Sequence, residues 1–171
     1  MPRTRNLMAA TMGEALLILI VAAIGRATGM PLIFASLGPT AYELLEQPHS
    51  KSARTYNIVV GHLVGLGAGF FALWVFNAWG SPKVLSAGFV PGIRIWATVL
   101  AGALTSGITL AIDANQPASL ATSLLVSLGS MQTVRSAVAI IIGVLILAGV
   151  GEPVRRQRAK YRPEVKVLPQ K

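Results

Sequence analysis

Four long apolar stretches constrain the fold of this chain more than any other feature of its sequence. They cover residues 7–28, 55–80, 95–112 and 133–151, and none contains more than two charged side chains. A helix needs about 20 mostly apolar residues to cross the hydrocarbon core of a bilayer. Because helices satisfy their own backbone hydrogen bonds in lipid, we predict an all-α fold, a polytopic transmembrane helix bundle with four long spans.

The composition agrees with a membrane protein. The mean hydropathy of the 171 residues is +0.63 and only 12% of them are charged, whereas soluble domains carry about 25% charged residues. Seven of the 15 Lys and Arg residues follow Glu152. We interpret residues 1–154 as the transmembrane domain and residues 155–171 as a basic cytoplasmic tail. Basic residues that flank apolar spans favour the headgroups of the lipid bilayer over nucleic acid as the partner.

Two further apolar segments are shorter and interrupted. Residues 30–45 contain Gly38-Pro39, and residues 117–129 are rich in small and hydroxyl side chains. We interpret both as broken or re-entrant helices. Irregular backbone at membrane depth survives only where it is buried in protein or lines a cavity, because lipid offers it no hydrogen bonds.

The two halves of the chain follow the same order of segments. A shift of 82 residues aligns Thr40 with Thr122, and the halves, about 7–80 and 92–152, each contain a long span, a short segment and a long span. We therefore predict two structural repeats. Interrupted segments at matching positions of two halves point to the binding site of a transporter.

Two topologies are open. If the short segments re-enter, the chain crosses four times and its halves are parallel; if they cross, six crossings make an inverted repeat. The distribution of Lys and Arg places both termini in the cytoplasm in either case. The residues before the first span are too few for an organellar transit peptide, so a bacterial inner membrane is the expected location.

A glycine pattern marks one face of the second long span. Gly61, Gly65 and Gly69 form two overlapping G-x-x-x-G motifs, and such a face lets another helix approach closely. The face could build the core of one protomer or an interface between copies. We expect a homo-oligomer that associates through these three glycines.

The short segments contain the candidate groups for binding an anion. Gly38 and Pro39 suit the first turn of a helix, and the free N–H groups of a helix start favour anions. Hydroxyl side chains would add donors without fixed charge: Ser36, Thr40, Ser119 and Thr122. The alternative is a structural kink filled by small residues.

His62 is an ionisable residue inside an apolar span. Such residues are costly in a membrane and usually functional, so we expect a proton relay or a donor to substrate. The alternative is a neutral histidine bonded to a neighbouring carbonyl. His49 falls in a loop, where a histidine is more often a solvated turn residue.

The sequence contains no pattern typical of an enzyme. It has no cysteine, nucleotide-binding loop, catalytic triad or close pair of carboxylates, and two histidines without neighbouring carboxylates do not make a metal site. We expect no enzymatic activity, no cofactor and no metal.

The first half of the chain resembles the HPP family of small integral membrane proteins. That family typically shows a G-x-x-A segment, then P-H-S, then an arginine-asparagine pair, then G-H before a glycine-rich span. The matching residues here are Gly38 to Ala41, Pro48-His49-Ser50, Asn57 and Gly61-His62. Two positions depart from the pattern: Tyr56 replaces the arginine, and Gln116-Pro117-Ala118 replaces the His-Pro-Pro tripeptide that names the family.

Some members of that family are linked to nitrite transport. The resemblance therefore implies a transporter or channel for a small monovalent anion, most simply nitrite. By position it implies these candidate site residues: Gly38, Thr40, Pro48, His49, Ser50, Asn57, Gly61 and His62.

The alternative is a non-transporting membrane scaffold or assembly protein that uses its glycine-rich helix faces. A transporter predicts His62, Thr40 and Thr122 around a shared polar pocket. A scaffold predicts them dispersed or tightly packed without a cavity.

Overall fold

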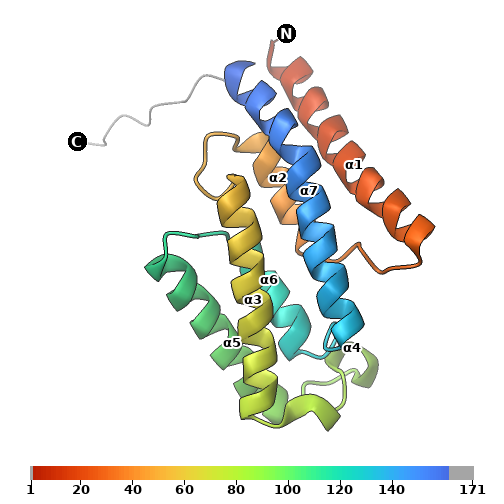
Figure 1. Cartoon of the computed structure of the whole chain (residues 1–171), viewed down its shortest axis with the longest axis vertical. Helices are drawn as coiled ribbons and strands as arrows, with labels where there is room; N and C mark the ends of the chain where they lie inside the picture. Colours follow the sequence, from red (N-terminus) through yellow and green to blue (C-terminus); the bar gives the residue numbers. More distant parts are fainter. Residues whose placement is uncertain (1, 162–171) are drawn as a thin grey trace.

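The computed structural model describes residues 2–161, and within them the chain forms helices and no strand. The elements are α1 (Pro2–Thr28), α2 (Leu37–Glu46), α3 (Thr55–Val75), the 3-10 turn η1 (Ala78–Gly80), α4 (Val84–Ala87), α5 (Gly92–Ala111), α6 (Ala118–Ser127) and α7 (Val134–Tyr161). Four of them, α1, α3, α5 and α7, are long and apolar enough to cross a membrane. The predicted all-α bundle with four long spans is confirmed (Figure 1).

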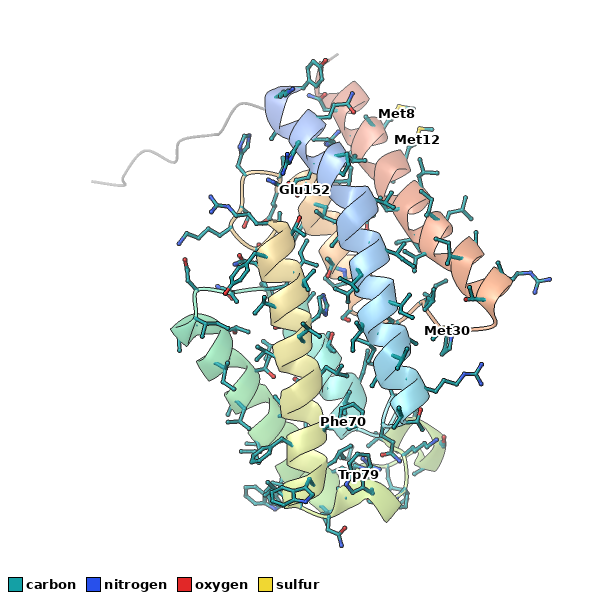
Figure 2. All side chains as sticks on the ribbon, viewed as in Figure 1. Met8, Met12, Met30, Phe70, Trp79 and Glu152 are labelled. Atoms are coloured by element: carbon teal, nitrogen blue, oxygen red, sulfur yellow. The ribbon has the colours of Figure 1, made fainter. Side chains whose placement is uncertain are left out.

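The outer surface of the bundle is apolar. Met8, Met12 and Leu19 on α1 are 59%, 68% and 61% exposed, and Figure 2 shows the two methionines on the outer side of this helix. Lipid tails cover such side chains at no cost, whereas water does not. Polar side chains are instead found within the bundle, where helices contact one another.

The first short segment runs along the length of α7. At one end Arg135 donates a hydrogen bond of 2.6 Å to the carbonyl of Gly29, and at the other the side chain of Leu44 lies against Gly151. The stretch of α7 between these contacts is about 24 Å long at 1.5 Å per residue. Residues 30–46 therefore traverse the bundle, extended in the first half and helical in α2.

The second short segment runs along α3. The side-chain amide of Asn57 donates to the carbonyl of Asp113 at 3.3 Å near the start of α3, and beyond its end Gln132 donates to the carbonyl of Trp79 at 3.2 Å. Residues 112–131 thus also traverse the bundle, with α6 as their helical part. Both segments therefore extend over the length of the bundle, as expected of broken helices that cross.

The path of the chain gives six traverses in alternating directions. Each half has a long, a short and a long helix, first α1, α2 and α3 and then α5, α6 and α7. The start of α1 and the end of α7 lie at the same end of the bundle (Figure 1). The second half therefore runs in the opposite sense to the first, as an inverted repeat requires.

The glycine face of α3 packs against α6 of the same chain. A Cβ atom at Gly65 would overlap the carbonyl oxygen of Ser119, and one at Gly69 would lie 2.7 Å from Cβ of Val126. Within one chain, α6 therefore fills the groove left by these glycines, and Gly61 faces Gln116 in the same way. The assignment of an oligomer interface to Gly61, Gly65 and Gly69 is thereby corrected.

The end of α7 differs from the prediction. The helix does not end with the apolar stretch 133–151 but continues through Pro153 to Tyr161. Arg155 forms an ion pair of 2.8 Å with Glu152 and donates to the carbonyl of Pro48 at 2.8 Å. The basic residues up to 161 are thus the last turns of a packed helix, and the rest of the predicted tail, 162–171, lies outside the described residues.

Candidate functional site

Four polar side chains meet inside the bundle and form what we name the central cluster: Ser36, Thr40, His62 and Thr122. His62 on α3 lies between the two threonines, with Nε2 3.0 Å from Oγ1 of Thr40 and Nδ1 2.7 Å from Oγ1 of Thr122. Ser36 Oγ lies 2.8 Å from Thr122 Oγ1. At most 1% of each residue is exposed, so the cluster is sealed from lipid and water.

The local structure explains why these groups meet. Ser36 is the residue before α2, and Thr40 lies one turn later, where its hydroxyl donates to the Ser36 carbonyl at 2.9 Å. His62 follows Gly61, whose lack of a side chain lets the chain before α6 approach α3. Thr122 lies in the middle of α6. The two broken crossings thus each contribute a threonine to one imidazole.

The cluster presents donors without fixed charge. A neutral imidazole has one donor and one acceptor nitrogen, and a hydroxyl both donates and accepts. Because the Thr40 hydroxyl donates its hydrogen to the Ser36 carbonyl, it accepts from Nε2–H of His62, and Nδ1 then accepts from the Thr122 hydroxyl. By rotation of their C–O bonds, the hydroxyl groups of the cluster can direct their hydrogens toward an anion, and no charged side chain has to move.

The two helix starts do not face each other across the cluster. Ser36 at the start of α2 reaches Thr122 in the middle of α6, because α2 and α6 run in opposite directions. Gly38 lies away from the cluster and lines an apolar cavity of about 460 Å³ with Ile18 and Phe34. The prediction that Gly38 contacts substrate has no support from this position.

The remaining predicted residues lie elsewhere. Ser119 is buried one turn before Thr122 on α6, and its carbonyl packs against Gly65. Asn57 bonds the carbonyls of Asp113 and Asn115 and so joins the start of α3 to the loop before α6.

The P-H-S residues belong to the loop between α2 and α3. His49 is exposed there, and the carbonyl of Pro48 accepts from Arg155. Ser50, whose Oγ lies 2.7 Å from that of Ser52, lines a cavity of about 370 Å³ that we name the end pocket. Its lining residues are Glu43, Gln47, Ser50, Lys51, Ser52, Leu110, Asp113, Asn115 and Pro117.

Sequence reasoning missed Glu43 and Gln116, which lie between the end pocket and the central cluster. Glu43 is 8% exposed and Gln116 1%. Glu43 comes three residues after Thr40 on α2, so the two share a helix face. Two signals in the sequence could have identified Glu43: its spacing from Thr40, and its ionisable side chain within a short apolar segment.

Arg94 is a second residue that sequence reasoning missed. It lies fully buried at the start of α5, at the end of the bundle opposite the end pocket. Its guanidinium donates to the carbonyls of Ser81, Pro82 and Ser127 at 2.7–3.3 Å and to Oε1 of Gln132 at 2.9 Å. Arg94 thus joins the loop before α4, the end of α6 and the loop before α7.

The fold and the buried polar cluster define a polytopic, all-helical integral membrane protein. The chain belongs to the HPP transmembrane family: the model described as HPP, transmembrane region, matches residues 1–162. The family predicted from residues 35–62 is therefore confirmed over nearly the whole chain. No curated protein and no solved structure matches it.

Proposed function

We propose that this protein transports a small monovalent anion, most simply nitrite, across the membrane by way of the central cluster. One observation carries the proposal: hydroxyl groups from both broken crossings converge on His62. Polar groups at membrane depth are expensive, and broken crossings that meet near the middle of the bundle are a common construction of transporter sites.

The chemistry of the cluster favours a weakly bound anion. Hydroxyl and imidazole N–H groups would replace part of the water around the anion, and the half-turn of free N–H groups at the start of α2 would add a positive potential. Because the cluster contains no lysine or arginine, binding stays weak enough for release. The same absence of fixed charge in the cluster disfavours divalent anions.

The cluster is closed in this structure, since its members bond to one another. Transport therefore requires α2 and α6 to move apart so that the hydroxyls of Thr40 and Thr122 can turn from His62 to the anion. The end pocket supplies the aqueous approach from one side. Arg94 and the loops that it joins close the other side.

The position of the basic residues leads us to propose how the protein is oriented in the membrane. Arg155, Arg156, Arg158 and Lys160 lie in the last turns of α7, at the end that also holds the start of α1 (Figure 1). By the positive-inside rule this end faces the cytoplasm. We propose a bacterial inner membrane as the location, with the end pocket open to the cytoplasm.

Uptake by purified protein in sealed liposomes tests the proposal. Nitrite is compared with nitrate, formate and chloride, and protein-free liposomes correct for diffusion of the neutral acids. We expect saturable flux of one small anion and its loss in Thr122→Val, because that change removes the hydroxyl that bonds both Ser36 and His62. Thr109→Val is the matched control, since the Thr109 hydroxyl bonds only within α5.

A scaffold is the second candidate, and a separate observation favours it. The cavity of about 80 Å³ beside His62 is otherwise lined by apolar side chains of α3 and α7, so this cavity is not a polar pocket shared by the cluster. A folded protein that gives no flux above protein-free liposomes for any of the four anions would support the scaffold.

A further inference from the structure

The carboxyl group of Glu43 stands apart from the other acidic groups near it. Glu43 is only 8% exposed, and its Oε2 atom has no hydrogen-bond partner in the described part of the chain. Its polar neighbours are the side chains of Ser52 and Gln116. The amide nitrogen of Gln116 is also without a partner among the described residues.

The ion pairs found among the described residues all join groups other than Glu43. Lys51 and Asp113 pair at 3.0 Å at the mouth of the end pocket, both well exposed. On α2 itself, Glu46 pairs with Arg158 at 3.4 Å.

On α7, Glu152 pairs with Arg155 at 2.8 Å and Arg156 at 2.7 Å. His62 on α3 bonds both threonines of the central cluster. Among the described residues, no cationic side chain forms an ion pair with Glu43.

A buried carboxylate without a cation is costly, because its charge loses the stabilisation of water. A proton is the simplest compensating cation, and the end pocket, which Glu43 lines, gives protons a route to it. A protonated carboxyl group is also a donor. It could then bond an acceptor that the ionised form would repel.

We propose that Glu43 is a proton-binding site that couples a proton to each transported anion. Thr40 lies about 5 Å along the axis of α2 from Glu43, at 1.5 Å per residue. An anion that approaches Thr40 and His62 from the end pocket passes the Glu43 carboxyl group. The ionised carboxyl group repels it, whereas the protonated group does not, so anion and proton cross together as a neutral pair.

This inference rests on the proposed function and assigns the proton to Glu43 instead of His62. Both nitrogens of His62 already bond threonine hydroxyls, which supply no charge to stabilise an imidazolium. His62 then acts as a hydrogen-bond donor to the anion.

Transport in liposomes gives the first test. An inward proton gradient should raise the protein-dependent initial rate of nitrite uptake in the wild type, and Glu43→Gln should abolish this response. Glu46→Gln on the same helix is the matched control and should keep it. An equal gradient response in Glu43→Gln, or a wild-type rate that follows a sodium gradient instead, overturns the proposal.

Infrared difference spectroscopy of the full chain in detergent gives a test without transport. Besides the bands of the other acidic side chains, the wild type and Glu46→Gln should share one titrating carboxylic C=O band that Glu43→Gln lacks. The absence of such a band from the wild type contradicts the proposal even if Glu43→Gln does not fold. A titrating Glu43 band together with no anion flux would reject the proposed function and retain the proton site.

Discussion

At the scale of the residue, the buried polar groups of this protein differ in how fully they are satisfied. Both nitrogens of His62 have a hydroxyl partner, and Arg94 has four oxygen acceptors. Oε2 of Glu43 has no hydrogen-bond partner among residues 2–161. Since unsatisfied buried groups cost stability, the unpaired oxygen of Glu43 is best explained by a ligand or a proton.

The central cluster makes a prediction for Thr122. Thr122→Val keeps the shape of the side chain and removes its hydrogen bonds to Ser36 and His62. We expect the free energy of unfolding in detergent to fall by about 1–2 kcal/mol, since one such bond in a membrane protein contributes about 0.6–1.7 kcal/mol. Reversible denaturation against Thr109→Val measures the difference, and equal stability of the two variants contradicts it.

Arg94 makes a second prediction at this scale. Arg94→Lys retains the charge but replaces the planar fork by a single ammonium group, which cannot reach acceptors on two loops and the end of α6 together. We expect a loss of about 2–4 kcal/mol, the order found when hydrogen bonds to a charged group are broken. The melting temperature in detergent checks this. A wild-type value in Arg94→Lys would show that the four contacts contribute little.

At the scale of the element, the contact between α3 and α6 positions the central cluster. The glycine face of α3 brings the backbone of α6 close enough for His62 to reach Thr122. On the other side, α2 approaches α3 through the bond between Thr40 and His62. The site therefore depends on helix spacing, and a change in that spacing alters the site without touching its side chains.

Gly65 tests this dependence. In Gly65→Ala the new methyl group would overlap the Ser119 backbone, which cannot turn aside as a flexible side chain does. We expect α6 to shift, with a loss of stability of about 1–3 kcal/mol from overpacking and a loss of any anion flux. Gly67→Ala is the control, because nothing lies within 4 Å of its added atom. Similar behaviour of the two variants contradicts the close contact.

At the scale of the whole molecule, six traverses in alternating directions bring two oppositely oriented halves together around one polar centre. The end pocket lies on one side of this centre and the Arg94 loops on the other. If the proposed transport holds, two halves of opposite orientation could exchange their roles, which is the usual basis of alternating access.

Labelling of single cysteines distinguishes six crossings from four. The chain has no cysteine of its own, so His49→Cys, Ser86→Cys and Lys160→Cys each provide one thiol. With six crossings, residues 49 and 160 react with a membrane-impermeant reagent from the same side and residue 86 from the opposite side. If residue 160 shares its side with residue 86 instead, the four-crossing topology is right.

The sequence by itself determined the class of the protein, the all-α bundle and its four long spans. These follow from local properties, since the bilayer thickness sets span length and lipid enforces helical hydrogen bonding. It also identified Thr40, His62 and Thr122 as candidates, because hydroxyl and ionisable side chains inside apolar segments are unusual.

Only the tertiary structure decided which of these candidates meet. Ser36 and Thr122 bond across a separation of 86 residues, and no local pattern encodes such a contact. The same holds for the glycine face, since a G-x-x-x-G motif allows a close approach without specifying its partner. The burial of Glu43 and the full traverse of both short segments likewise follow from packing, because they depend on where the neighbouring helices lie.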